Sequence, residues 1–129
     1  MNTPRIFHTS IVALAALMFS AHTVLAGTAT WLASGSTGAW NNPLNWTPIT
    51  VPNGPSDVAT FGTTDQLIPS ALLTTDIEVN GIIFNPGAPT FTIAGENVTF
   101  TISGTGITNN SSSAHGLLAT GASGVLRFQ

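Results

Sequence analysis

The fold of this chain is decided by residues 82–102, which read IIFNPGAPTFTIAGENVTFTI. Within this stretch, apolar residues alternate with threonine at 90–93 and again at 98–102. A period of two is the pattern of a β-strand that buries one of its faces. The breaks between the runs contain proline, glycine and asparagine, which favour turns. The stretch therefore predicts short strands joined by tight turns.

Two sets of apolar residues recur in this stretch at intervals of nine: Ile82, Phe91 and Phe100, and Phe84, Ile93 and Ile102. Two architectures produce such a spacing. One is an antiparallel meander, and the other is a β-solenoid, in which each coil of chain stacks on the previous one. The break at residues 95–97 suits a hairpin loop as well as a solenoid corner, so the spacing alone leaves both architectures open.

The rest of the chain after residue 26 also predicts strands. Glycine or proline interrupts almost every window of about a dozen residues, so helices are not expected. Further alternating runs occur at 57–61, 77–79 and 126–128. The chain is therefore predicted to be all-β, with one buried row of side chains: Val58, Phe61, Ile82, Phe84, Phe91, Ile93, Phe100 and Ile102.

The first 26 residues have the pattern of a helical, cleaved secretory signal peptide. Arg5 supplies a positive charge before the apolar run IVALAALMF at 11–19, and Val24 and Ala26 are small enough for signal peptidase. We expect cleavage between Ala26 and Gly27 and export of the rest. The alternative is a retained membrane anchor, but the run is shorter than the roughly 18 residues that span a bilayer.

Composition limits what the exported part does. It is long enough for one domain, and Arg127 is its only Lys or Arg in a chain of formal net charge −3. Nucleic acid is therefore not an expected partner, because binding it depends on many basic contacts to phosphates.

The chain has no cysteine, so packing and backbone pairing must stabilise it without disulfides. The final residues, 124–129, still follow a strand pattern, which predicts that the chain continues in a longer protein.

Eight short motifs in the exported part occur in a recognisable order. They are Thr30-Trp31, Trp40, Asn45-Trp46, Val51-Pro52, DVATF at 57–61, IIFN at 82–85, FTI at 91–93 and SGTGITN at 103–109. Together they resemble the opening module of the autotransporter-associated β-strand repeat proteins. The resemblance covers roughly residues 28 to 110.

This resemblance implies a right-handed parallel β-helix. Residues 27–56 would be an irregular, tryptophan-rich N-terminal cap, and residues 57–129 the first solenoid coils. It further implies a bacterial protein that is secreted or held at the cell surface or outer membrane, with a non-catalytic role in adhesion, matrix building or display. Its partners would be downstream repeats of its own chain and possible surface or matrix polysaccharides. The mature chain would have no membrane span, and the family has no catalytic residues to transfer.

Trp31, Trp40 and Trp46 support two interpretations. Large aromatic side chains cover the apolar end of a solenoid well, and their position before the repeats favours this role. The same rings could instead form a stacking platform in a small carbohydrate-binding β-sandwich.

A polysaccharide-active β-helix enzyme is the second alternative. Asp76 and Glu78 lie two residues apart and could share one strand face, but Ile77 and Val79 then define the buried face and direct the acids to solvent. His115 is the only histidine after residue 26 and falls in a predicted loop. We therefore expect no catalytic residues, no metal site, no cofactor and no enzymatic activity.

Overall fold

The computed structural model describes residues 27–32, 37–66 and 69–129. The predicted signal peptide, including Ala26 of its cleavage site, lies outside these residues. Within the described ranges, no helix is long and apolar enough to cross a membrane.

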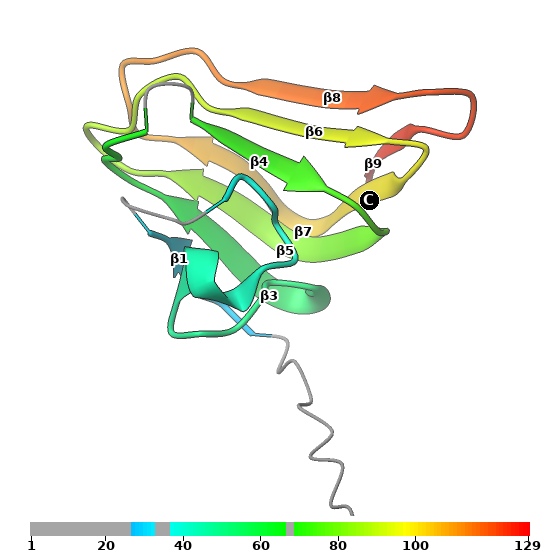
Figure 1. Cartoon of the computed structure of the whole chain (residues 1–129), viewed down its shortest axis with the longest axis horizontal. Helices are drawn as coiled ribbons and strands as arrows, with labels where there is room; N and C mark the ends of the chain where they lie inside the picture. Colours follow the sequence, from blue (N-terminus) through cyan, green and yellow to red (C-terminus); the bar gives the residue numbers. More distant parts are fainter. Residues whose placement is uncertain (1–26, 33–36, 67–68) are drawn as a thin grey trace, which may run out of the picture.

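Almost all regular structure in the described ranges is β-strand, which confirms the all-β prediction (Figure 1). A single turn of 3-10 helix, η1, covers Pro43–Asn45. The strands are β1 (Ala29–Trp31), β2 (Trp46–Thr47), β3 (Gly54–Phe61), β4 (Ser70–Leu73), β5 (Ile77–Phe84), β6 (Thr92–Glu96), β7 (Thr99–Asn109), β8 (Gly116–Thr120) and β9 (Val125–Phe128).

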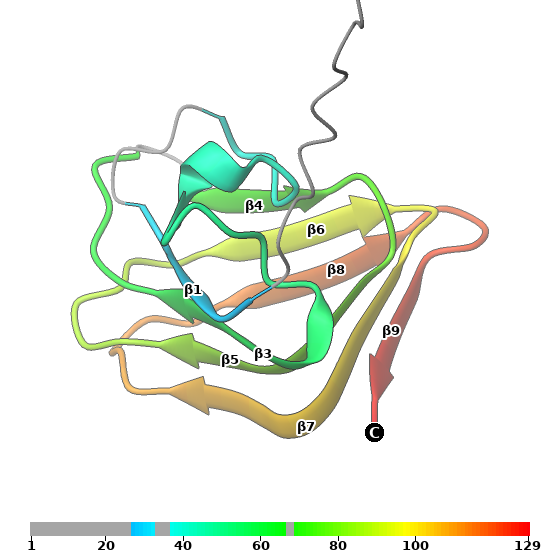
Figure 2. The same cartoon turned by 90° about the horizontal axis from the view of Figure 1, so that it is seen from below.

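The strands form two sheets that face each other across the core (Figure 2). The larger sheet has the order β2-β1-β3-β5-β7-β9, and the smaller has the order β4-β6-β8. All strand pairs are parallel except β1 with β2. The chain passes from the large sheet to the small one and back in every coil. The first coil contains β3 and β4, the second β5 and β6, and the third β7 and β8. The result is a β-solenoid of about three turns, which excludes the antiparallel meander.

Strand register explains the nine-residue spacing. Residues that stack between coils are much farther apart in sequence, because Phe61 pairs with Phe84 and Ile82 pairs with Ile107. The members of the nine-residue sets lie instead on successive sides of the solenoid. Ile82 is in β5, Phe91 precedes β6, and Phe100 is in β7. The nine-residue spacing is therefore the number of residues from one side of the solenoid to the next.

Seven of the eight side chains predicted for the interior are buried, and Val58 is the exception. Residues that are two apart on a strand face the same way, so Val58 and Phe61 cannot share a face of β3. The buried face of β3 consists of Asp57, Ala59 and Phe61. Asp57 is accommodated there because its carboxylate accepts a hydrogen bond from the Asn53 backbone N–H at 3.1 Å.

Polar side chains at the corners, and that of Asn80 within β5, join one coil to the next. Oxygen atoms of Asn53, Asp76, Asn80 and Asn97 accept hydrogen bonds from the backbone nitrogens of Glu78, Thr99, Thr105 and Ser123, respectively. Each bond spans 23 to 26 residues. These contacts help to fix the register between coils, and no disulfide is available to do so.

Candidate functional site

The N-terminal end of the solenoid is closed by segments that pair with the first coil. Strand β1 pairs with β3 of the large sheet. On the small sheet, the Leu72 N–H donates to the Gly38 carbonyl at 2.6 Å, and the Trp40 N–H donates to the Leu72 carbonyl at 2.8 Å. Both edges of the first coil are therefore partly covered.

The three tryptophans lie beneath this covered end. Trp46 contacts Trp31 and Trp40 edge to face, with ring centroids 4.9 Å apart in both pairs. All three rings contact Phe61 of the first coil. The indole nitrogen of Trp40 donates to the Pro52 carbonyl, and that of Trp46 donates to the Trp40 carbonyl. The rings join the cap to the core.

Burial of these rings bears directly on the stacking-platform interpretation. Trp31 is 3% exposed, and Trp40 and Trp46 are completely buried. A sugar stacks on a ring face that solvent can reach. In this packing the three rings contribute to the core instead of presenting a platform.

Asn45 was not singled out from the sequence as more than part of a motif, yet it is fully buried beside these rings. Its side-chain nitrogen donates to the carbonyls of Thr37 and Ala39 at 2.7 and 2.8 Å. Asn45 thus holds the segment that covers β4. The sequence signal for this role is the position of Asn45 directly before Trp46. A polar residue between aromatic residues of the cap needs hydrogen-bond partners inside the protein.

The C-terminal end is open. Strands β8 and β9 are the last strands of their sheets, and no described strand pairs with their outer edges. Side-chain exposure along one interior row rises at this end of the solenoid. Val79 and Ile102 are 0% and 1% exposed, but Phe128, which pairs with Ile102, is 61% exposed. The apolar stack thus continues onto an uncovered surface.

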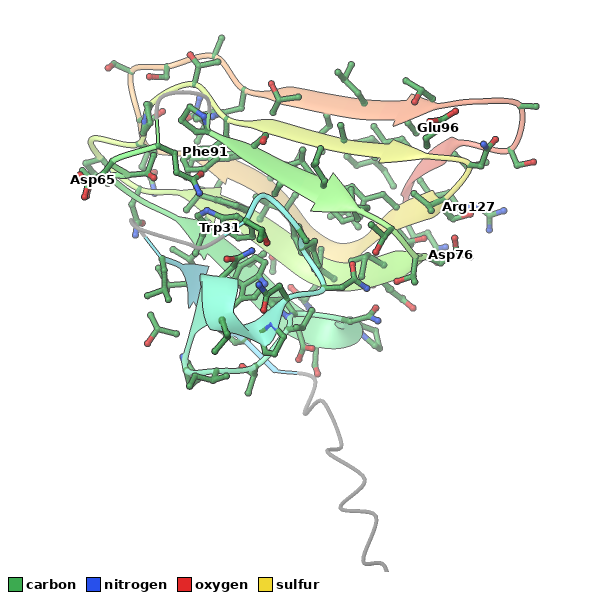
Figure 3. The ribbon with its side chains drawn as sticks, in the orientation of Figure 1. Trp31, Asp65, Asp76, Phe91, Glu96 and Arg127 are labelled. Atoms are coloured by element: carbon green, nitrogen blue, oxygen red, sulfur yellow. The ribbon has the colours of Figure 1, made fainter. Side chains whose placement is uncertain are left out.

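A polar groove of about 440 Å³ crosses the outer face of the large sheet. Its lining residues come from successive coils: Asn53, Asp76, Ile77, Glu78, Thr99, Thr101 and Arg127. Glu78, Thr101 and Arg127 are in register across β5, β7 and β9. Figure 3 shows Asp76, which directly precedes β5, and Arg127 of β9 on the same side of the molecule. The solenoid therefore places a carboxylate, a hydroxyl and a guanidinium in a row.

Thr101 forms the floor of this groove. It is only 9% exposed, and none of the described residues bonds its hydroxyl. The carboxylate of Asp76 is already engaged with the Thr99 N–H at 2.8 Å. As the strand alternation predicts, Ile77 and Val79 are buried while Asp76 is exposed and Glu78 is half-buried. The row can donate and accept hydrogen bonds, as ligands rich in hydroxyl groups require.

His115 lies at the other end of the strands, in the connection from β7 to β8. Its ring stacks on Phe84, with centroids 3.6 Å apart and planes at 4°. Its Nδ1 atom accepts from the Phe91 N–H at 3.2 Å, and its Nε2 atom is 2.9 Å from the Ser111 hydroxyl. Desolvation by burial lowers the pKa of His115 from the ordinary 6.5. The residue is in a loop, as predicted, but it packs against the core.

Within the described ranges, no group of three or more His, Cys, Asp or Glu side chains could hold a metal ion.

No protein-family model matches the chain, and no curated protein or solved structure matches it either.

Proposed function

We propose that residues 27–129 form the N-terminal cap and opening coils of an exported, right-handed β-solenoid with a structural role and no catalysis. The protein would be of the autotransporter-associated β-strand repeat type. Its full chain would act at a bacterial surface in adhesion, matrix building or display of another domain.

The observation that carries this proposal is the difference between the two ends. One end has three buried tryptophans and backbone pairing to both sheets of the first coil. The other has two parallel edge strands and an exposed apolar side chain at the end of an interior row, Phe128 at 61%. Exposed edge strands of this kind pair readily with further strand. In solenoids, each unit buries its apolar face against the next unit.

The partner that best fits the open end is a further coil of the same chain. Every strand pair between successive coils is parallel, and the register shifts only at 54–58 of β3 and 79–81 of β5. An added coil would extend the interior rows that end at Leu117 and Phe128. It would remove their apolar surface from water, at about 25 cal/mol per Å².

The test is to isolate the native protein with an antibody raised against residues 27–129. We expect an antigen that is larger than a 129-residue chain and is found in the surface or culture-medium fraction. A cell-associated antigen no larger than 129 residues would contradict the proposal. A matched blot with an antibody against residues 1–26 should detect no mature antigen if the signal peptide is removed.

A second candidate function, carbohydrate binding, is favoured by the Thr101 hydroxyl, which has no bond to a described residue and lies on the floor of the polar groove. Glu78 accepts hydrogen bonds and Arg127 donates them, and no ion pair joins Arg127 to a described carboxylate. A neutral saccharide spanning the row could bond to all three groups. A ligand that binds there need not change tryptophan fluorescence, because the tryptophan rings are buried elsewhere.

Titration calorimetry with soluble neutral oligosaccharides tests this candidate. We expect binding that Thr101→Val and Arg127→Gln weaken, whereas Glu96→Gln, which changes a carboxylate outside the polar groove, has no effect. Binding that is the same in all variants would exclude the groove. Absence of heat with several oligosaccharide classes would favour the purely structural role.

A further inference from the structure

The aromatic core of the solenoid ends in a titratable ring. Phe61 contacts Phe84 and Phe91, with ring centroids 5.4 and 5.0 Å apart. His115 follows on the third coil, stacked on Phe84. Gly116 pairs with Thr92, so His115 occupies in its coil the position that Phe91 occupies in the coil before.

The hydrogen bonds of His115 fix its tautomer. Because Nδ1 accepts from the Phe91 N–H, it carries no proton, and the neutral ring must carry its proton on Nε2. The Nε2–H then donates to the Ser111 hydroxyl, whose own proton goes to the Asn109 side-chain oxygen at 2.8 Å. The geometry is satisfied only by a neutral histidine.

We propose that His115 is a pH-sensitive latch that holds the third coil on the second when neutral and releases the β7–β8 connection when protonated. Protonation of Nδ1 would set two N–H donors against each other at the Phe91 contact. It would also place a positive charge in a partly desolvated position. The Phe91 side chain is fully buried, so its N–H would lose the acceptor with little access to water.

No described neighbour compensates this charge by contact. The groups that bond to or stack on His115 or its partner Ser111 are Phe84 of β5, Phe91 before β6, Asn109 of β7 and the backbone of Ser113. None of them is titratable in the relevant range. Asp65 is the carboxylate that Figure 3 labels at this end of the molecule, and it is exposed, so solvent screens it.

The latch acts on β8, the edge strand of the small sheet, with which a further coil would pair. The Gly116 N–H donates to the Phe91 carbonyl at 2.9 Å, directly beside the His115 bond to the Phe91 N–H. Loss of the histidine contact therefore loosens the start of β8. The latch itself depends only on the described contacts, and not on the proposed function.

Amide hydrogen exchange followed by NMR on the full chain tests the latch. After correction for intrinsic exchange, we expect the protection of the Phe91 amide and of the amides of 116–120 to fall about 5-fold or more from pH 7 to pH 5, as for a buried N–H that loses its acceptor. The amides of β3 and β5 should keep their protection over the same range.

Two variants distinguish the effect of protonating His115 from the effect of its ring packing. In His115→Asn a side-chain oxygen can replace Nδ1 as acceptor, and in His115→Phe the ring stack is kept. Neither side chain titrates, so protection at 116–120 should be independent of pH in both. The His115 ring resonance, identified by its loss in the variants, should titrate below 6.5. A midpoint at or above 6.5, or equal pH dependence in the wild type and both variants, would overturn the proposal.

Discussion

The side-chain oxygen of Asn80 accepts two hydrogen bonds from Thr105 of the next coil, at 3.2 Å from the backbone nitrogen and 2.8 Å from the hydroxyl. The Asn80 side chain also occupies the space above Gly104, where an added Cβ would come within 2.5 Å of the Asn80 amide nitrogen. An asparagine on one coil and a glycine on the next therefore fit together, and both are needed for close stacking.

Asn80→Ala should lower the free energy of unfolding by about 1–2 kcal/mol, because the two hydrogen bonds from Thr105 and a third, from the Asn80 side-chain nitrogen to the Pro55 carbonyl, are lost. Urea denaturation measures this value. Asn110→Ala is the matched control, since the Asn110 side chain is exposed and its bond to the Phe84 carbonyl is made by its backbone N–H, which alanine keeps. A loss in the control equal to that in Asn80→Ala would contradict a specific role for Asn80.

Gly104→Ala should also destabilise the chain, because the new methyl group displaces the Asn80 side chain. The cost should be smaller when Asn80 is already alanine, so a double-mutant cycle should give a coupling of about 0.5 kcal/mol or more. Gly62→Ala is the control, since a Cβ at Gly62 would meet no atom within 4 Å. Additive effects of Asn80→Ala and Gly104→Ala would show that the two sites are independent.

Trp46→Ala should destabilise the chain by about 3–5 kcal/mol, as is usual when a large buried aromatic side chain is removed. Trp46 is fully buried and contacts Trp31, Trp40 and Phe61. Leu44, two residues away, is 59% exposed, and Leu44→Ala should change the free energy of unfolding by less than about 0.5 kcal/mol. Similar effects in the two variants would mean that the cap does not stabilise the solenoid.

The open end should make the isolated chain associate at high concentration. Phe128→Lys should reduce this association, because a charge at the exposed end of β9 opposes edge pairing. Ile49→Lys is a matched control, since Ile49 is 67% exposed at the capped end and Phe128 is 61% exposed at the open end. Sedimentation velocity measures the result, and equal association in both variants would locate the contact elsewhere.

The free energy of unfolding should fall as the pH decreases below 6.5. Because burial lowers the pKa of His115 in the folded chain, the unfolded chain binds the proton more strongly. The stability is therefore complete above pH 6.5 and is lost as the pH falls toward the folded pKa. Urea denaturation between pH 7.5 and 5 should show this slope in the wild type. A slope of the same size in His115→Phe would assign it to other groups.

The sequence by itself determined the β-strand class of the chain and most of its interior. The alternation at 90–93 and 98–102 is a local property, because neighbouring side chains on a strand must point to opposite faces. Phe91, Ile93, Phe100 and Ile102 are accordingly buried. The same rule contradicts the predicted inward position of Val58, because Phe61 sets the buried face of β3.

Only the tertiary structure decided how the strands pair. Between successive coils, the parallel register joins residues 22 to 26 apart, such as Phe61 with Phe84 and Ile82 with Ile107, and no local pattern specifies such a partner. The same holds for the site residues: the groove around Thr101 and the stacking of His115 on Phe84 exist only because successive coils align. Side-chain alternation is set within one strand, whereas coil stacking is set by the packing of the whole chain.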